Sequence, residues 1–234
     1  MATPQPASPP FRSEDRNRTV CYIDTGSGLK EASWPYERGG PAFPDFGDHN
    51  PELDITIKDL QLSESFQTLW KESTPLGYGS DACIRLTDHV SHPVIKLAHP
   101  KAECRQRLRR EFEVMRCLTH LPVVAQIYPE PLTDEDGIFG FRTERLHRLE
   151  KEDTSARKED IKAMLDKVHQ AGYCHGDVHF CNIMERQGGE LVLIDFAYAG
   201  RLGDAVPDDV PKRMYRSRTY GVEVDLERLD GRFI

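Results

Sequence analysis

A short segment near residue 180 carries residue types that can do chemistry together. Asp177 is followed five residues later by Asn182, and a second aspartate, Asp195, follows the apolar run 191–194. The first aspartate can face a hydroxyl nucleophile, while the other two side chains offer the hard oxygen ligands that Mg²⁺ prefers. The spacing therefore predicts that the three side chains converge on one point.

This arrangement resembles the protein-kinase-like superfamily. Asp177 and Asn182 match the D-x-x-x-x-N of its catalytic loop, and residues 195–197, D-F-A, match its metal-binding D-F-G with alanine in the last place. Residues 175–179, H-G-D-V-H, are most similar to aminoglycoside and choline phosphotransferases and to small atypical kinases. They depart from the H-R-D form of regulated protein kinases.

The upstream motifs that this resemblance requires occur in the expected order. Residues 76–82, L-G-Y-G-S-D-A, resemble the Gly-rich loop, whose backbone N–H groups approach phosphate without a Cβ in the way. Residues 94–97, V-I-K-L, resemble the strand that carries the nucleotide-binding lysine, and residues 144–146, E-R-L, resemble the hinge that holds adenine. The cofactor-binding residues implied by the resemblance are Gly77, Gly79, Ser80, Lys96, Glu144 and Leu146.

The resemblance also implies a reaction, the Mg²⁺-dependent transfer of the ATP γ-phosphoryl group to a hydroxyl. Asp177 would act on the acceptor hydroxyl, and Lys96, paired with Glu111 of the following helix, would position the phosphates. Asn182 and Asp195 would hold the metal. ATP and Mg²⁺ are therefore the expected cofactors.

Gly176 stands where regulated kinases have an arginine that pairs with a phosphate on the activation loop. Neutral glycine cannot form that ion pair, which predicts no switching by phosphorylation of residues 199–211.

Each motif taken alone has a more ordinary interpretation. A lone glycine pair is often a turn, a lone lysine on a strand is often a surface charge, and Asp195 could simply end its strand. A zinc site is a further alternative, because two histidines and two cysteines cluster at residues 174–181 with an H-x₃-H spacing. The ordered set of motifs favours the kinase-like interpretation over both.

The acceptor stays open among three classes of function. An atypical protein Ser/Thr kinase is favoured by the short chain, and a small-molecule kinase of the aminoglycoside or choline type is favoured by the H-G-D-V-H form. An ATP-binding pseudokinase that serves as an interaction module is the third, and the intact motif residues speak against it. We expect the first.

Composition narrows the class of protein. The chain has 234 residues with 31 Lys+Arg against 39 Asp+Glu, a net charge of −8, and six cysteines at irregular spacings. The acidic balance argues against nucleic-acid binding through phosphate contacts, and the cysteines are typical of reduced thiols. The longest apolar runs reach about half of the roughly 18 residues that a membrane helix needs. With no apolar signal core at its start, the chain is expected to be intracellular and cytoplasmic.

The pattern along the chain predicts an α+β, two-lobed protein-kinase-like fold with a truncated helical C-lobe. Half of the sixteen prolines lie in the first 51 residues, so residues 1–50 are expected to form a disordered or extended Pro/Gly-rich arm. Residues 51–146 would form the N-lobe and residues 147–234 the shortened C-lobe. Strands are expected at 55–57, 66–70, 82–86, 94–98, 123–127, 138–143 and 191–194, and helices at 103–118 and 155–172.

The C-terminal part is shorter than the resemblance requires. Only 39 residues follow Asp195, and Asp225 resembles the aspartate that braces the catalytic loop from the central C-lobe helix. A protein partner that covers the base of this lobe is one expected consequence.

Overall fold

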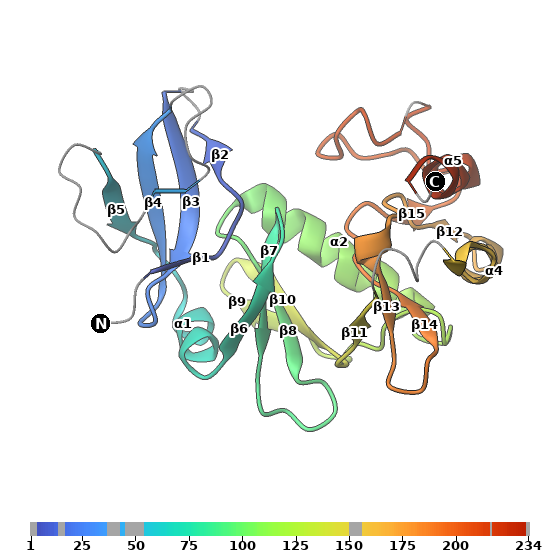
Figure 1. The fold of residues 1–234 in the computed structure, drawn as a ribbon, viewed down its shortest axis with the longest axis horizontal. Coiled ribbons are helices and arrows are strands. Elements are labelled where there is room, and N and C mark those ends of the chain that lie inside the picture. The colour runs from blue at the N-terminus through green and yellow to red at the C-terminus, as the bar shows by residue number, and fades with distance from the viewer. Residues whose placement is uncertain are drawn as a thin grey trace.

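A computed structural model describes residues 4–13, 17–36, 43–44, 54–149, 156–215 and 217–232 of the chain. Helices and strands are mixed, which confirms the α+β class, whereas the division into two lobes stays a prediction. An N-terminal sheet lies at one end of the molecule, helices α4 and α5 lie at the other, and the long helix α2 lies between them (Figure 1).

The central sheet has the strand order β6-β7-β8-β10-β9, and every neighbouring pair is antiparallel. Strands β7 and β8 span the residues predicted for them, and β10 matches its prediction within one residue. The residues predicted at 123–127 instead contribute only isolated bridges. The bounds are Thr74–Tyr78 for β6, Ala82–Leu86 for β7, Val94–Ala98 for β8, Leu132–Asp134 for β9 and Gly137–Thr143 for β10.

Helix α2 (Ala102–Leu118) packs on β8 and β10. Its residues Leu108, Phe112, Met115 and Leu118 step by three and four, as the sequence predicts for one helical face, and all four are buried. The same apolar cluster continues into α4, β14 and α5, so a single core joins the central sheet to the C-terminal elements.

The N-terminal region is not the disordered arm that its composition predicts. Strands β1 to β5 form an antiparallel sheet, and β4 pairs with β5 across the predicted boundary at residue 50. The central strands are buried on both faces, because Cys21 and Ile23 pack on one side and Tyr22 on the other, where it joins the core of the central sheet. The bounds are Gln5–Pro6, Phe11–Arg12, Arg18–Asp24, Leu29–Pro35 and Thr56–Asp59. Residues 1–3, 14–16, 37–42 and 45–53 of the predicted arm and boundary lie outside the described residues.

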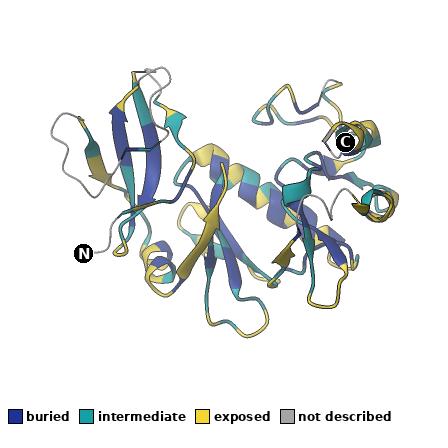
Figure 2. Cartoon of the chain, in the orientation of Figure 1, coloured by how far each residue is buried: buried dark blue, intermediate teal, exposed yellow. Residues whose placement is uncertain are grey.

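The burial pattern explains why composition misled. Figure 2 shows β3 and β4 largely buried, whereas the edge strands β5 and β6 are largely exposed. The described prolines of this region lie at the ends of strands or between them, and the average composition over 50 residues hides the two buried seven-residue strands β3 and β4.

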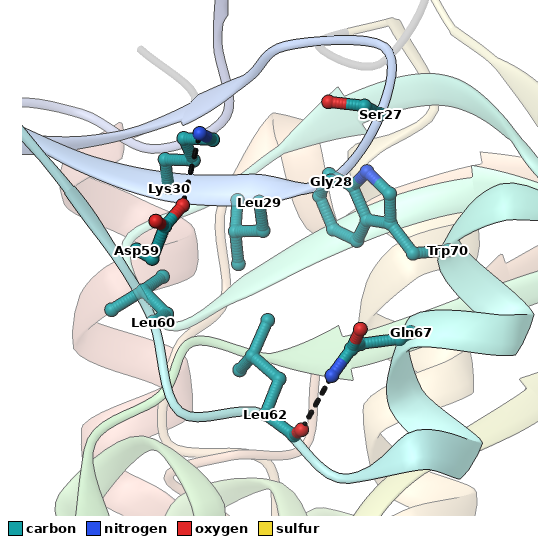
Figure 3. Close-up of a pocket in the computed structure, with 9 residues that line it drawn as sticks. All are labelled: Ser27, Gly28, Leu29, Lys30, Asp59, Leu60, Leu62, Gln67 and Trp70. Atoms are coloured by element: carbon teal, nitrogen blue, oxygen red, sulfur yellow. Dashed lines mark hydrogen bonds and ion pairs between the residues drawn. The ribbon is translucent and has the colours of Figure 1, made fainter.

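Helix α1 (Glu64–Lys71) occupies the residues predicted as a strand at 66–70, and that prediction is wrong. Phe66 and Trp70 are four residues apart and both are buried, which is the spacing of one helical face. The Ser63 hydroxyl accepts a hydrogen bond from the N–H of Phe66 and caps the helix. Between α1, β4 and β5 lies a hollow of about 310 Å³, and the Lys30–Asp59 ion pair, at 2.9 Å, lies at one side of it (Figure 3).

The C-terminal elements surround the loop that carries Asp177. Helix α4 ends just before Gly172, whose φ of 85° suits a residue that terminates a helix. Strands β11, β13 and β14 form a small sheet, and β12 pairs with β15. The bounds are His147–Arg148 for β11, Lys158–Gln170 for α4, Tyr173–Cys174 for β12, Ile183–Glu185 for β13, Leu191–Leu193 for β14, Gly200–Arg201 for β15 and Val222–Arg232 for α5. None of the helices in the described part of the chain has the length and apolar composition needed to cross a bilayer.

Candidate active site

Helix α5 holds the loop that carries Asp177. The Asp225 carboxylate, fully buried, accepts hydrogen bonds from the N–H groups of His175 at 2.8 Å and Gly176 at 2.7 Å. His169 of α4 lies 2.8 Å from the same carboxylate. The bracing contact predicted for Asp225 is therefore present, and it joins α4, α5 and the loop.

Gly176 is required by geometry at its position. Its φ is +76°, and a Cβ there would collide with the Tyr215 hydroxyl and the Tyr198 carbonyl. The backbone conformation therefore disfavours an arginine in this place, and the close contacts leave no space for its side chain.

Asp177 has a basic neighbour that sequence inspection missed. Arg228 of α5 donates from Nη1 to the Asp177 Oδ1 at 2.5 Å, and His179 Nε2 lies 3.5 Å from Oδ2. Burial opposes the ionised form, but His179 and Arg228 lower the pKa of Asp177 below its ordinary value, which keeps it a carboxylate at neutral pH. The available signal was the position of Arg228, three residues after Asp225 on the same helix.

Asn182 is hydrogen-bonded both to Asp177 and to the residue that precedes Asp195. Its side-chain amide donates to the Asp177 carbonyl at 2.9 Å, and its own carbonyl accepts from the Ile194 N–H at 3.1 Å. The three oxygen-bearing residues predicted to converge are thus linked through adjacent backbone. The Asn182 side chain is oriented by this bond, with its N–H₂ group directed toward the loop.

Lys96 connects the central sheet to the C-terminal elements. Its ammonium donates to both Glu111 carboxylate oxygens, at 2.7 and 2.8 Å, and to Asp195 Oδ1 at 3.1 Å. The predicted Lys96–Glu111 pair is therefore present. Burial alone would lower the pKa of Lys96, but Asp195 and Glu111 raise it above its usual range, so the ammonium stays charged. Burial raises the pKa of Glu111 to about 7, although Lys96 opposes this shift.

Asp195 has a backbone conformation that few non-glycine residues adopt. Its φ is +62°, a region that costs about 1–3 kcal/mol and is concentrated at functional sites. The next residue, Phe196, is fully buried, and its ring centroid lies 4.6 Å from that of His175. This packing anchors the chain directly after Asp195. The Asp195 side chain is 40% exposed and available to a ligand.

The Gly-rich segment forms the open hairpin between β6 and β7. Gly79 N–H donates to the Ala82 carbonyl at 2.8 Å, and a Cβ at Gly77 would meet nothing within 4 Å. Ser80 is exposed in the same turn. The Gly79 N–H is therefore used within the turn, while the space in front of Gly77 is open, as the close approach of a phosphate requires.

The predicted hinge differs in detail from the expectation. The Glu144 side chain is held by Arg186 at 2.7 and 2.9 Å, and it accepts from the Gln126 N–H at 2.7 Å. Leu146 packs against the main core. Glu144 thus has a structural ion pair, and its side chain is not directed to a ligand.

A second ion pair ties α2 to the segment that follows Asp195. Arg110, adjacent to Glu111 on α2, contacts both carboxylate oxygens of Asp209 at 2.7 and 2.9 Å. The two side chains are only 15% and 12% exposed. The Asp209 carboxylate is therefore a permanent partner of Arg110 on α2. In proteins that are switched by phosphorylation of a loop, a phosphate group can form this kind of ion pair with an arginine.

The donor set fits Mg²⁺ better than zinc. Magnesium is held in phosphate-transfer sites by one or two protein oxygens together with phosphate oxygens and water, and Asp195 and Asn182 can supply those oxygens. His175 Nε2 is engaged with the Ile194 carbonyl at 2.9 Å, and His179 Nδ1 accepts from the Cys181 N–H at 3.2 Å. In the described part of the chain, no three His, Cys, Asp or Glu side chains are grouped to hold a metal.

Comparison with known proteins gives two matches. Residues 141–219, about a third of the chain, match the model of the lipopolysaccharide kinase (Kdo/WaaP) family, and this stretch includes Asp177, Asn182 and Asp195. The chain is also similar to the mitogen-activated protein kinase HOG1 of Eremothecium gossypii, with 27% identity over 178 residues. That alignment covers 67% of this chain but only 40% of the length of the relative.

Proposed function

Because this chain belongs to the protein-kinase-like superfamily, we propose that it moves the γ-phosphoryl group of Mg·ATP to a hydroxyl acceptor. The observation that carries the proposal is the set of ion pairs centred on Lys96, which joins Glu111 of α2 to Asp195. A largely buried lysine held between two carboxylates retains its charge at a fixed point. That is what positioning of a triphosphate requires.

The other residues have roles that follow from their surroundings. Asp177, an ionised carboxylate in a loop fixed by Asp225, would orient the acceptor hydroxyl and accept its proton. Asn182 and Asp195 would hold Mg²⁺, which neutralises charge on the transferred phosphoryl group when bound. Gly77, Gly79 and Ser80 would approach the phosphates.

The backbone of residues 144–146 would meet adenine, and Leu146 would contact the adenine from the core side. The Glu144 side chain would have no role in nucleotide recognition, because Arg186 already binds it.

We propose a protein hydroxyl group, on serine or threonine, as the first acceptor class. The similarity to a mitogen-activated protein kinase supports this acceptor class. The fixed Arg110–Asp209 pair supports a kinase that does not depend on phosphorylation of its own segment.

One observation favours a small-molecule acceptor as the alternative. A hollow of about 460 Å³ lies beside α5 and shares Arg228 with the Asp177 ion pair. Its volume is in the range of sites for small ligands. It is lined by Arg213, Met214, Ser217, Glu223, Val224, Glu227, Arg228 and Gly231.

Thermal melting with Mg·ATP, followed by turnover of γ-labelled ATP, tests the proposal. We expect a rise in melting temperature and transfer of label to protein, whereas label in soluble metabolites would select the small-molecule alternative.

Asp195→Asn removes a metal-ligand charge, so turnover should fall by about two orders of magnitude or more. Asp166→Asn, an exposed position on α4, is the matched control and should retain full activity. Equal turnover by Asp195→Asn and the wild-type chain would contradict the mechanism, and binding of Mg·ATP without turnover would support the ATP-binding pseudokinase.

The Arg110–Asp209 pair yields a separate prediction. Asp209→Ala leaves Arg110 unpaired and loosens the segment from α2, so we expect kcat for ATP turnover to fall about tenfold through misplacement of Glu111. Asp208→Ala is the control, because that neighbouring side chain is fully exposed and its contact with Arg218 is 3.3 Å long. Steady-state kinetics compare the two variants. Equal kcat values would show that the pair has no part in positioning α2.

A further inference from the structure

His99 lies directly behind the Gly-rich hairpin and has no counterpart among the motifs discussed above. The residue follows β8 and is only 1% exposed. Its Nε2 lies 3.0 Å from the Gly79 carbonyl oxygen. Because a carbonyl only accepts, Nε2 must carry the proton and donate it. The buried His99 side chain is thus hydrogen-bonded to the backbone of the hairpin at its second glycine, Gly79.

The same residue holds the other side of the turn through its backbone. The His99 N–H donates to the Asp81 carbonyl at 2.8 Å. The Asp81 carboxylate accepts from Arg107 of α2 at 2.7 Å. The turn between Gly79 and Ala82 is therefore fixed to the residue that follows β8 and to α2.

The N-terminal sheet lies against the imidazole of His99. The ring of Tyr22, a buried residue of β3, is 5.1 Å from the His99 ring centroid at an interplanar angle of 31°. Cys83, next to the hairpin, lies 3.7 Å from His99 Nδ1 and donates from its thiol to the Ala7 carbonyl at 3.1 Å. The N-terminal sheet therefore contacts His99, and His99 in turn contacts the hairpin.

We propose that His99 is a positioning residue that holds the Gly-rich hairpin for the phosphates of ATP, and that the N-terminal sheet supports it through Tyr22. The inference rests on the proposed function, because it assigns the hairpin to phosphate. A phosphate-binding hairpin acts through backbone N–H groups, whose direction changes when the adjacent carbonyl is released. Loss of the Gly79 contact should therefore weaken binding of the phosphates and leave binding of the nucleoside unchanged.

The test measures dissociation constants for Mg·ATP and for adenosine by calorimetry. His99→Phe keeps a ring beside Tyr22 but has no donor for Gly79, and we expect its affinity for Mg·ATP to fall about tenfold with less than a twofold change for adenosine. His99→Gln retains an N–H at a similar reach and should restore most of the Mg·ATP affinity. Tyr22→Leu removes the supporting ring and should change the ratio in the same direction as His99→Phe.

Thermal melting shows whether each variant is folded, and His99→Met, which is flexible and lacks a donor, replaces His99→Phe if the phenyl ring is not accommodated. A similar loss for adenosine and Mg·ATP would indicate a general structural effect and overturn the inference, as would an unchanged ratio. If the wild-type chain binds adenosine and Mg·ATP equally, the inference fails while nucleotide binding stands. If it binds neither, the proposed function fails and takes the inference with it.

Discussion

Replacement of Asp177 by asparagine should lower kcat for phosphoryl transfer by about 10²–10⁴-fold, the usual contribution of a positioned general base. The amide has the same shape but cannot accept the proton of the acceptor hydroxyl. The loop itself should persist, because Asp225 holds it through the N–H groups of His175 and Gly176, which the substitution leaves in place. Binding of Mg·ATP should therefore change little.

The control is Asp204→Asn, an exposed aspartate in the segment that follows β15, which should turn over at the wild-type rate. Single-turnover measurement of γ-phosphoryl transfer at saturating Mg·ATP, together with thermal melting, separates loss of chemistry from loss of folding. A folded Asp177→Asn protein with wild-type kcat would remove Asp177 from the mechanism. Asp177 and Arg228 would then form a structural pair only.

Replacement of Asp24 by alanine should reduce the free energy of unfolding by about 3 kcal/mol, since breaking a buried ion pair leaves an uncompensated charge. Asp24 of β3 accepts from Arg85 of β7 at 2.8 Å and from the Trp70 indole N–H at 3.2 Å. Arg85 is only 3% exposed, and its guanidinium lies 3.9 Å from the Trp70 ring centroid. This cluster joins the N-terminal sheet to α1 and to the central sheet.

The matched control is Asp59→Ala, whose carboxylate pairs with Lys30 on the same sheet at 2.9 Å and is visible in Figure 3. Its side chain is 88% exposed, so the loss should be less than about 1 kcal/mol. Denaturant unfolding of both variants measures the difference. If Asp24→Ala is no less stable than Asp59→Ala, the Asp24–Arg85 pair does not anchor the N-terminal sheet to the rest of the fold.

Much of the site could be predicted because its residues lie in short motifs. The pairing of Lys96 with Glu111 is expected from the resemblance of this strand and the following helix to those of protein-kinase-like proteins, because a lone lysine on a strand or a lone glutamate on a helix does not predict it. Asp177 and Asn182 are five residues apart. Asp195 follows closely after β14, which pairs with β13, the strand that begins directly after Asn182. Local spacing is enough in these cases only together with the order of the motifs along the chain, since each motif alone has a more ordinary interpretation.

The elements that were wrong share a cause. Composition averaged over residues 1–50 hid the consecutive buried residues of β3 and β4. The apolar residues at 66–70 fit a strand as well as a helix until Phe66 and Trp70 are seen on one buried face. Short apolar runs do not distinguish the two periods. The packing partner decides between them.

The chemical identity of the motif residues and their order along the chain are local properties, and the sequence alone established them. Three contacts between distant segments depend on the tertiary structure. The Asp177–Arg228 pair joins residues 51 positions apart, and the Arg110–Asp209 pair joins residues 99 positions apart. His99 is 20 residues from Gly79, and it also contacts Tyr22 of the N-terminal sheet. No periodicity encodes contacts at such separations. They arise only when the core has packed and has brought each buried charge or donor to the partner that offsets its desolvation.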